Sequence, residues 1–181
     1  MSVTVDATGT LRAQEHGHQP AIVSMTPWDV QSRRIYPDNG IWPSLYAGEG
    51  GGHGYVKTVS GILRRLTPLE YERLQGYPDG WTDIGPWVDS AGKRHKERSD
   101  TARYKALGNS IALPPWAWVL KRLCACYERP ATMASLFDGI GGFPLLWERL
   151  NGPGTCLWAS EIEEFPMAVT KQRFGGNNET D

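Results

Sequence analysis

Residues 134–143, ASLFDGIGGF, decide what kind of fold this chain has. A short apolar run leads into a turn with three glycines, and an apolar segment of helical character follows, with Leu145, Leu146, Trp147 and Leu150. This order predicts a buried parallel strand, a tight turn and the N-terminus of a helix. Glycines at such a turn let the backbone bend sharply and let a ligand lie against bare amide groups. The stretch therefore predicts an α/β fold with a ligand site at the turn.

A second apolar run, residues 156–160 (CLWAS), ends at Glu161, nineteen residues after Gly142. In nucleotide-binding α/β folds an acid about 20 residues beyond the glycine loop binds the ribose hydroxyls. The glycine spacing is G-x-G-G and differs from the dinucleotide pattern G-x-G-x-x-G. A nicotinamide-dependent oxidoreductase is therefore a weak alternative.

The composition is that of one domain, or of a piece of a larger protein, with 181 residues, 19 basic and 20 acidic. The near-neutral charge gives no global basic field for nucleic acid. Three cysteines without a C-x-x-C pair fit a reducing cytosol. No apolar run approaches the ~20 residues of a membrane span. We expect a cytoplasmic protein without a membrane partner, and no metal site, because His16 and His18 lack further ligands at a suitable spacing.

Residues 1–60 predict a β-rich, loop-rich segment with a faint internal repeat. Leu11, Ala13, Gly17-His18 and Val23 recur as Leu45, Ala47, Gly52-His53 and Val56. We interpret the two copies as hairpin-like units. The glycine run at residues 48–54 is either a flexible turn or a loop that approaches a nucleic-acid backbone.

Two local patterns follow between residues 62 and 103. Thr67 and Glu70 form a capping box with Pro68 at the first helical position, and Gly76 ends that helix. Residues 89–103 carry a cluster of basic side chains, interpreted as a solvated loop with phosphate contact as the alternative: Lys93, Arg94, His95, Lys96, Arg98 and Arg103.

A short helix is then expected to end at Gly108, and Ser110 to cap a longer helix from about Leu113 to Tyr127. The buried face of the longer helix is predicted to carry Trp116, Val119, Leu120 and Leu123.

These segments resemble the sequence motifs of one protein family. Residues 136–143 (LFDGIGGF) look like the S-adenosylmethionine loop of the DNA cytosine-5 methyltransferases, and residues 158–162 (WASEI) resemble that family's second motif. Residues 64–78 are similar to its ninth motif and Gly108-Asn109-Ser110 to its tenth, while residues 10–13 look only loosely like its target-recognition region.

The resemblance implies a partial Rossmann-like α/β sheet, S-adenosyl-L-methionine as cofactor and double-stranded DNA as partner. The ninth motif would be structural, and the tenth would approach the methionine end of the cofactor. The cofactor-binding residues implied are Phe137, Asp138, Gly139, Ile140, Gly141, Gly142, Phe143, Glu161, Ile162, Asn109 and Ser110.

The order of the motifs is unusual, because the ninth and tenth precede the first and second. Either the chain is circularly permuted, or the tail of one methyltransferase is joined to the head of another. We divide it into part of a target-recognition region (1–61), a helical region of the ninth and tenth motifs (62–130) and the start of the cofactor-binding domain (131–181).

No catalytic residue can be assigned. The family's nucleophile is a cysteine after proline, whereas the three cysteines here follow Leu123, Ala125 and Thr155. Residues 31–35 (QSRRI) only half-resemble its Q-x-R-x-R motif. The prediction is therefore a partial or permuted DNA cytosine-5 methyltransferase whose partner is a second polypeptide with the Pro-Cys segment. The alternative is a non-catalytic subunit or remnant that binds S-adenosylmethionine or DNA.

Overall fold

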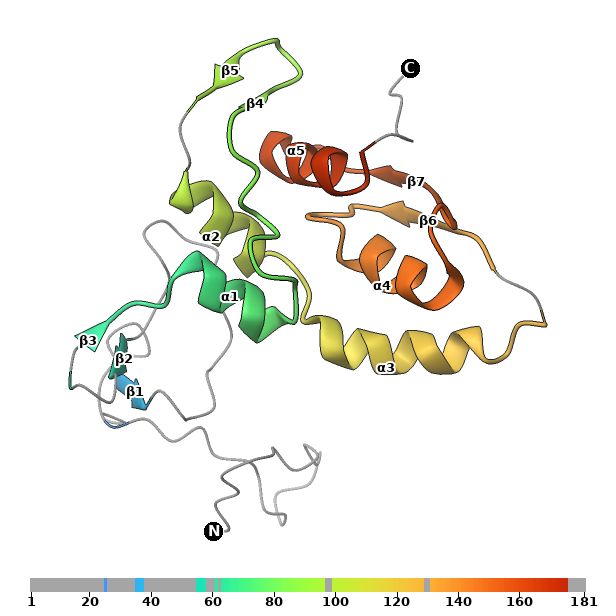
Figure 1. The fold of residues 1–181 in the computed structure, drawn as a ribbon, viewed down its shortest axis with the longest axis horizontal. Coiled ribbons are helices and arrows are strands. Elements are labelled where there is room, and N and C mark those ends of the chain that lie inside the picture. Colours follow the sequence, from blue (N-terminus) through green and yellow to red (C-terminus); the bar gives the residue numbers. More distant parts are fainter. Residues whose placement is uncertain are drawn as a thin grey trace. The chain divides into compact units, whose positions relative to one another are not determined.

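The computed structural model is a mixed α/β structure of short strands and helices (Figure 1). It describes residues 25, 35–37, 55–57, 61, 63–96, 99–128 and 131–175. Internal contacts divide the chain into two compact units, residues 1–45 with 52–66, and residues 46–51 with 67–181. Each unit has hydrogen-bonded strands of its own.

The described part of the first unit is a three-stranded sheet. Its strands are β1 (Ile35–Pro37), β2 (Tyr55–Lys57) and β3 (Leu63–Arg64), in that order. β1 pairs parallel with β2, and β3 pairs antiparallel with β2. Tyr36 and Val56 are buried. A β-rich segment is thus present, but most of the internal repeat, the glycine run at 48–54, residues 31–34, His16 and His18 lie outside the described residues.

The second unit holds five helices and four strands in its described residues. In chain order they are α1 (Pro68–Gln75), β4 (Trp87–Val88), β5 (Arg94–His95), α2 (Asp100–Gly108), α3 (Leu113–Cys124), β6 (Met133–Leu136), α4 (Gly142–Asn151), β7 (Cys156–Ser160) and α5 (Glu164–Arg173). β4 and β5 form an antiparallel pair, and β6 and β7 a parallel pair. α1 packs on α2, α3 on α4, and α4 on both β6 and β7.

The start and end of α1 confirm the predicted capping chemistry. The Thr67 amide donates to Glu70 Oε2 at 2.7 Å, and the Glu70 amide donates to Thr67 Oγ1 at 3.3 Å. Gly76 ends the helix with φ of +83°, a backbone conformation that favours glycine. All of these groups lie within one helical turn of each other or at the helix end, so the sequence alone determines them.

The segment β6–turn–α4–β7 has the predicted order of strand, glycine turn, helix and parallel strand. The pairs Ala134↔Trp158 and Leu136↔Ser160 place those four residues on one face of the sheet. The expectation that β6 is fully buried was wrong for this face, where Leu136 is 63% and Trp158 50% exposed. The reason is that this sheet has two strands in the described residues, and α4 covers it from the side of the buried Ser135.

Helix α3 packs on α4, but three of its four residues that were predicted to be buried are exposed. Leu120 is buried, but Val119 and Leu123 remain 43% and 44% exposed. The buried positions Leu113 and Leu120 are two helical turns apart, so only this stripe of the helix is covered in the described structure. Trp116 is also exposed.

The cap of α3 also differs from the prediction. Its N-cap residue is Ala112 and makes no side-chain capping bond. Ser110 instead bonds to Tyr77. The Pro-Pro pair in the first turn starts the helix without a cap, since proline fixes a helical φ and has no amide that needs a partner.

A buried ion pair links α1 to α2. Arg103, interpreted from the sequence as part of a solvated loop, is 2% exposed and donates to the fully buried Glu72 at 3.2 Å. Glu72 also accepts the amides of Gly80 and Thr82 at 2.6 and 2.9 Å, and the hydroxyl of Thr82. The solvated-loop interpretation was wrong for Arg103, because its partner lies 31 residues earlier on another helix.

In the part of the chain that the structure describes, no helix is both long enough and apolar enough to span a bilayer.

Candidate functional site

The glycine turn and Glu161 lie at the same end of the β6–β7 sheet. Leu136 pairs with Ser160, and the Asp138 amide donates to the Ser160 carbonyl at 3.0 Å, so the two strands end together. In open α/β sheets, ligands bind at the carboxyl ends of parallel strands. The arrangement therefore brings the glycine turn and Glu161 together where such a ligand would bind.

Glu161 is held against the turn by three backbone amides. Its Oε2 accepts from the Gly139 amide at 2.6 Å, and its Oε1 accepts from the amides of Ile162 and Glu163 at 2.7 and 3.0 Å. Partial burial raises the pKa of this carboxyl, but the three amide hydrogen bonds outweigh burial and hold the pKa below its usual range. Glu161 is thus an ionised acceptor at neutral pH.

The turn itself has an unusual backbone. Gly139 and Gly141 adopt φ of +58° and +80°, which glycine tolerates. Phe137 has φ of +53° without being glycine, and its side chain is 81% exposed. Such a conformation costs about 1–3 kcal/mol and is concentrated at functional sites. An exposed aromatic ring in strained backbone beside Glu161 is suited to cover a ligand.

Asp138 is a second carboxyl in the same turn. It is 7% exposed; the Ser135 hydroxyl donates to its Oδ1 at 2.5 Å, while its Oδ2 is buried without a hydrogen-bond partner. Burial raises the pKa of Asp138 to about 6, with a further increase from the charge of Glu161 and a decrease from the Ser135 hydroxyl. This group therefore changes its charge just below neutral pH.

The segments before the turn in sequence form its opposite wall. Tyr77 Oη lies 2.5 Å from Ser110 Oγ, and a Cβ added to Gly142 would lie 2.5 Å from the same Tyr77 oxygen. Burial raises the pKa of Tyr77 to about 12, so the phenol stays neutral. The Trp81 indole donates to the Ile140 carbonyl at 2.8 Å. Residues separated by more than 30 positions in the chain thus close on the glycine turn.

The sequence-predicted residues occupy different environments at this site. Ile140 is fully buried, Gly141 and Gly142 are covered by protein atoms, and Phe143 makes a T-shaped contact with Trp116 at 5.0 Å. The side chains of Phe137 and Ile162 are both 81% exposed, and those of Glu161, Phe143 and Ser110 are partly exposed. Ser110 reaches the turn through Tyr77, whereas Asn109 is an exposed residue at the end of α2. Their role in cofactor binding stays a prediction.

Sequence reasoning missed Tyr77 and Trp81 as parts of the site. Tyr77 lies inside the stretch that resembles the ninth motif, but that motif was interpreted as structural only. The signal that could have identified both residues is the pair of large aromatics just after the helix-ending Gly76, since buried Tyr and Trp side chains need a hydrogen-bond partner.

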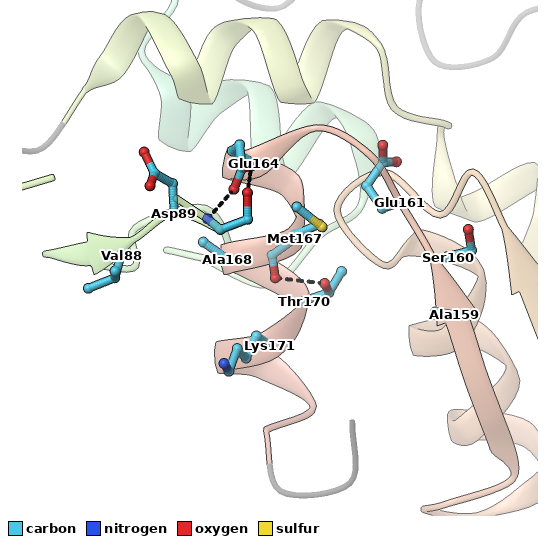
Figure 2. Close-up of a pocket in the computed structure, with 11 residues that line it drawn as sticks. Val88, Asp89, Ala159, Ser160, Glu161, Glu164, Met167, Ala168, Thr170 and Lys171 are labelled. Carbon is cyan, nitrogen blue, oxygen red and sulfur yellow. Dashed lines mark hydrogen bonds between the residues drawn. The ribbon is translucent and has the colours of Figure 1, made fainter. Parts of the chain in front are cut away.

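A cavity of about 390 Å³ lies beside Glu161 on the α5 side (Figure 2). Its lining includes Val88, Ser160, Glu161, Glu164, Met167 and Lys171. The glycine-turn residues do not line this cavity, and Glu161 is the predicted site residue that does. The cavity is thus bounded by the end of β7, by α5 and by the β4–β5 hairpin.

No group of three or more His, Cys, Asp and Glu side chains suited to a metal ion occurs in the described residues.

Comparison with known proteins finds DNA methyltransferases. The chain is 33% identical over 140 residues to the DNA N-6-adenine-methyltransferase of Escherichia phage P1. This match covers 64% of this chain and 18% of that protein. It is 38% identical over 56 residues to the Type II methyltransferase M.Sau3AI of Staphylococcus aureus, 31% of this chain and 10% of that protein. It is 27% identical over 157 residues to the DNA (cytosine-5)-methyltransferase DRM1 of Arabidopsis thaliana, 85% of this chain and 21% of that protein.

No protein-family model matches the chain. The chain spans about a fifth or less of the length of these relatives, and their names divide between adenine and cytosine as the modified base. The chain is thus similar to parts of DNA methyltransferases, the class of enzyme that the sequence motifs resemble.

Proposed function

We propose that this chain is the cofactor-binding part of a DNA cytosine-5 methyltransferase, and that it binds S-adenosyl-L-methionine between the glycine turn and Glu161. The observation that carries the proposal is the 2.6 Å hydrogen bond from the Gly139 amide to Glu161 Oε2, at the carboxyl ends of two parallel strands. It joins the two segments that resemble the family's first and second motifs.

The residues present fit the chemistry of this cofactor. Glu161 is an ionised carboxylate whose Oε1 already accepts two backbone amides and whose Oε2 accepts one, so Oε2 can accept one further hydrogen bond, from a ribose hydroxyl. Such a charge-assisted hydrogen bond is stronger than a neutral one. The turn bears a second carboxyl, Asp138, whose free Oδ2 adds negative potential. S-adenosylmethionine is a cation that supplies an activated methyl group. A site with two acidic groups, without a metal-binding cluster in the described residues, favours such a ligand over a nucleoside phosphate.

The residues around the turn have separate roles in this proposal. Phe137 covers the nucleoside with its exposed ring, and Glu161 orients the ribose. Tyr77 holds Ser110 against the turn, so that the segment with Asn109 and Ser110 closes the methionine end. In this proposal the parallel pair β6–β7, with α4, is part of a Rossmann-like sheet.

In this proposal a partner segment supplies the catalytic nucleophile. Burial raises the pKa of Cys156 to about 11, which keeps its thiol protonated and unreactive. Cys126 donates to the Arg122 carbonyl and Cys124 accepts from Asn151, and no cysteine follows a proline. The partner would be a second polypeptide, or a further segment of the same protein, with the Pro-Cys nucleophile.

The exposed apolar side chains indicate where this partner segment would dock. Leu136 and Trp158 are exposed on one sheet face, Leu157 is exposed in β7, and Phe137 and Ile162 are exposed at the end of the sheet. Helix α3 exposes Trp116, Trp118, Val119 and Leu123, and Tyr127 is exposed just after the helix. Apolar patches of this extent mark protein interfaces. The relatives are several times longer than this chain, so they have further protein that could cover an equivalent face.

Calorimetric titration of the full 181-residue chain with S-adenosylmethionine tests the proposal. Glu161→Ala should weaken binding by about 1.5–3 kcal/mol, the value of hydrogen bonds to a charged group, or roughly ten- to a hundredfold. The matched control is Glu163→Ala. It removes an equal charge two residues away from Glu161, and Glu163 forms an exposed ion pair with Lys105. Equal affinities for Glu161→Ala and the parent, both shown to be folded, would remove Glu161 from the site.

A second candidate function has support from one relative, which is named as an N-6-adenine methyltransferase. The base is identified by supplying the chain with a Pro-Cys partner segment and radiolabelled cofactor, and then digesting the DNA to nucleosides. Label in 5-methylcytosine supports the cytosine proposal, and label in N6-methyladenine overturns it. A non-catalytic subunit would bind the cofactor and DNA but produce neither nucleoside with any partner segment.

A further inference from the structure

The β4–β5 hairpin, residues 87–96, lies outside the proposed cofactor site and is held together by contacts of its own side chains. Asp89 fixes its turn: Oδ1 accepts from the amides of Ala91 and Lys93 at 3.1 and 2.8 Å, and Oδ2 lies 2.9 Å from His95 Nε2. The rings of Trp87 and His95 stack at 4.0 Å with 4° between their planes. A two-strand hairpin is only marginally stable in isolation, so these contacts define its shape.

The hairpin is also attached to α5. The Ser90 amide donates to Glu164 Oε2 at 2.9 Å, and the Ser90 hydroxyl donates to Glu164 Oε1. Trp87 makes a T-shaped contact with Phe165. Figure 2 shows Glu164 joined to the hairpin beside the cavity that Glu161 also lines. The hairpin is therefore fixed to the helix that begins three residues after Glu161.

Three cations project from this fixed hairpin. Lys93, Arg94 and Lys96 are exposed, and none of them makes an ion pair with another side chain in the described part of the chain. His95 faces Trp87, so the alternation within β5 places Arg94 on the opposite face, and Lys96 follows directly after the strand.

Other cations of the second unit have structural partners. Arg103 pairs with Glu72, Lys105 with Glu163, and Arg173 donates to the carbonyls of Gly80 and Trp81. The nearby acids Asp89 and Glu164 are occupied by hydrogen bonds within the hairpin and its attachment. The charges of Lys93, Arg94 and Lys96 are thus left for an external anion.

We propose that the β4–β5 hairpin contacts the phosphate backbone of double-stranded DNA through Arg94 and Lys96, with Lys93 adding positive charge at the turn. This rests on the proposed function for the choice of DNA as the polyanion. Phosphate contacts fix the register and orientation of a protein on DNA and carry no sequence information. The hairpin therefore positions the duplex relative to α5 and the cofactor site and does not select the target sequence.

Two matched double variants test this contact. Arg94→Ala with Lys96→Ala, and Lys121→Ala with Arg149→Ala, each remove two exposed positive charges. Binding of a fluorescent duplex is measured by anisotropy over a range of salt concentrations. Each phosphate contact contributes about 0.9 to the slope of log K against log salt. The hairpin variant should bind more weakly and lose about 2 from this slope, while the control should stay close to the parent.

A charge-conserving variant separates charge from folding. Arg94→Lys with Lys96→Arg should retain the parent's slope, because phosphate is bound through charge at both positions. An unchanged slope in the alanine variant, equal losses in both alanine variants, or no DNA binding by the parent would each overturn the proposal.

Calorimetry with S-adenosylmethionine on the same proteins distinguishes this proposal from the cofactor proposal. The hairpin variant should bind the cofactor as the parent does. If the hairpin variant loses the salt slope but none of the proteins binds the cofactor, the proposed function is contradicted and the DNA contact stays supported. Cofactor binding with no effect of the hairpin variant on DNA would do the reverse.

Discussion

The buried pair of Glu72 and Arg103 provides the sharpest test of how the second unit is held together. Glu72→Gln preserves the shape of the side chain but removes its charge. It also replaces one carboxylate oxygen by an NH₂ group, whereas both oxygens of Glu72 accept hydrogen bonds, from the Gly80 and Thr82 amides. Arg103, 2% exposed, loses its buried counter-charge.

The magnitude follows from what remains around Arg103. Removing one partner of a buried ion pair costs about 3–5 kcal/mol. Asp100, at 3.2 Å and 57% exposed, still faces the guanidinium, so we expect the lower end, about 3 kcal/mol. Glu72→Met with Arg103→Met should cost less than Glu72→Gln, because an apolar pair leaves no unpaired charge behind.

Urea denaturation followed by tryptophan fluorescence and by circular dichroism measures this loss. The two signals should have the same midpoint if the unit unfolds cooperatively. Arg73→Gln, at the helical position next to Glu72, is the control: it breaks the bidentate pair with Asp79, but both side chains are solvent-exposed, and the midpoint should hardly move. A loss below about 1 kcal/mol for Glu72→Gln would refute the view that this pair holds α1 to α2.

Three further predictions concern packing, pH and catalysis. Leu120→Ala should lower the free energy of unfolding by about 2–5 kcal/mol and Leu123→Ala by much less, because only Leu120 is buried on α4; equal urea midpoints for the two variants would contradict this packing. Asp138 has a folded-state pKa of about 6, above its value in an unfolded chain, so its stabilising effect is complete at acidic pH and is lost as pH rises through about 6. As pH rises from acidic to mildly alkaline, the free energy of unfolding of Asp138→Asn, relative to that of the parent, should therefore increase by roughly 3 kcal/mol in urea titrations. A difference between the two proteins that does not change with pH would exclude the raised pKa. The chain alone should transfer no radiolabelled methyl group to DNA, and transfer abolished by one Cys→Ser change would show that a nucleophile was overlooked.

Local chemistry was predictable from the sequence, and contacts between distant segments were not. The capping box of Thr67 and Glu70 and the strand–turn–helix at residues 133–151 each depend on residues within a short stretch. The bond between Tyr77 and Ser110 joins residues 33 positions apart, and no periodicity signals it. For α3 the apolar pattern was clear, but a pattern cannot say which of its apolar positions a neighbouring helix covers.

The proposed site was located better than it was described. Glu161 lies against the glycine turn as its spacing suggested, because parallel strands of similar length end at the same edge. The glycines were interpreted as room for a ligand. The structure adds a second cause, since Tyr77, Thr170 and Phe174 occupy the space beside Gly141 and Gly142.

The close packing around Gly141 and Gly142 affects how the results of mutational screens are interpreted. A Cβ at Gly141 would meet Phe174 at 2.6 Å, and one at Gly142 would meet Tyr77 at 2.5 Å, so alanine at either position would disturb folding whether or not a ligand binds. Gly139 has no such neighbour within 4 Å, although its positive φ still disfavours other residues. Intolerance of substitution at Gly141 or Gly142 would therefore say nothing about the cofactor, and a screen for binding defects is more informative at Phe137 and Glu161.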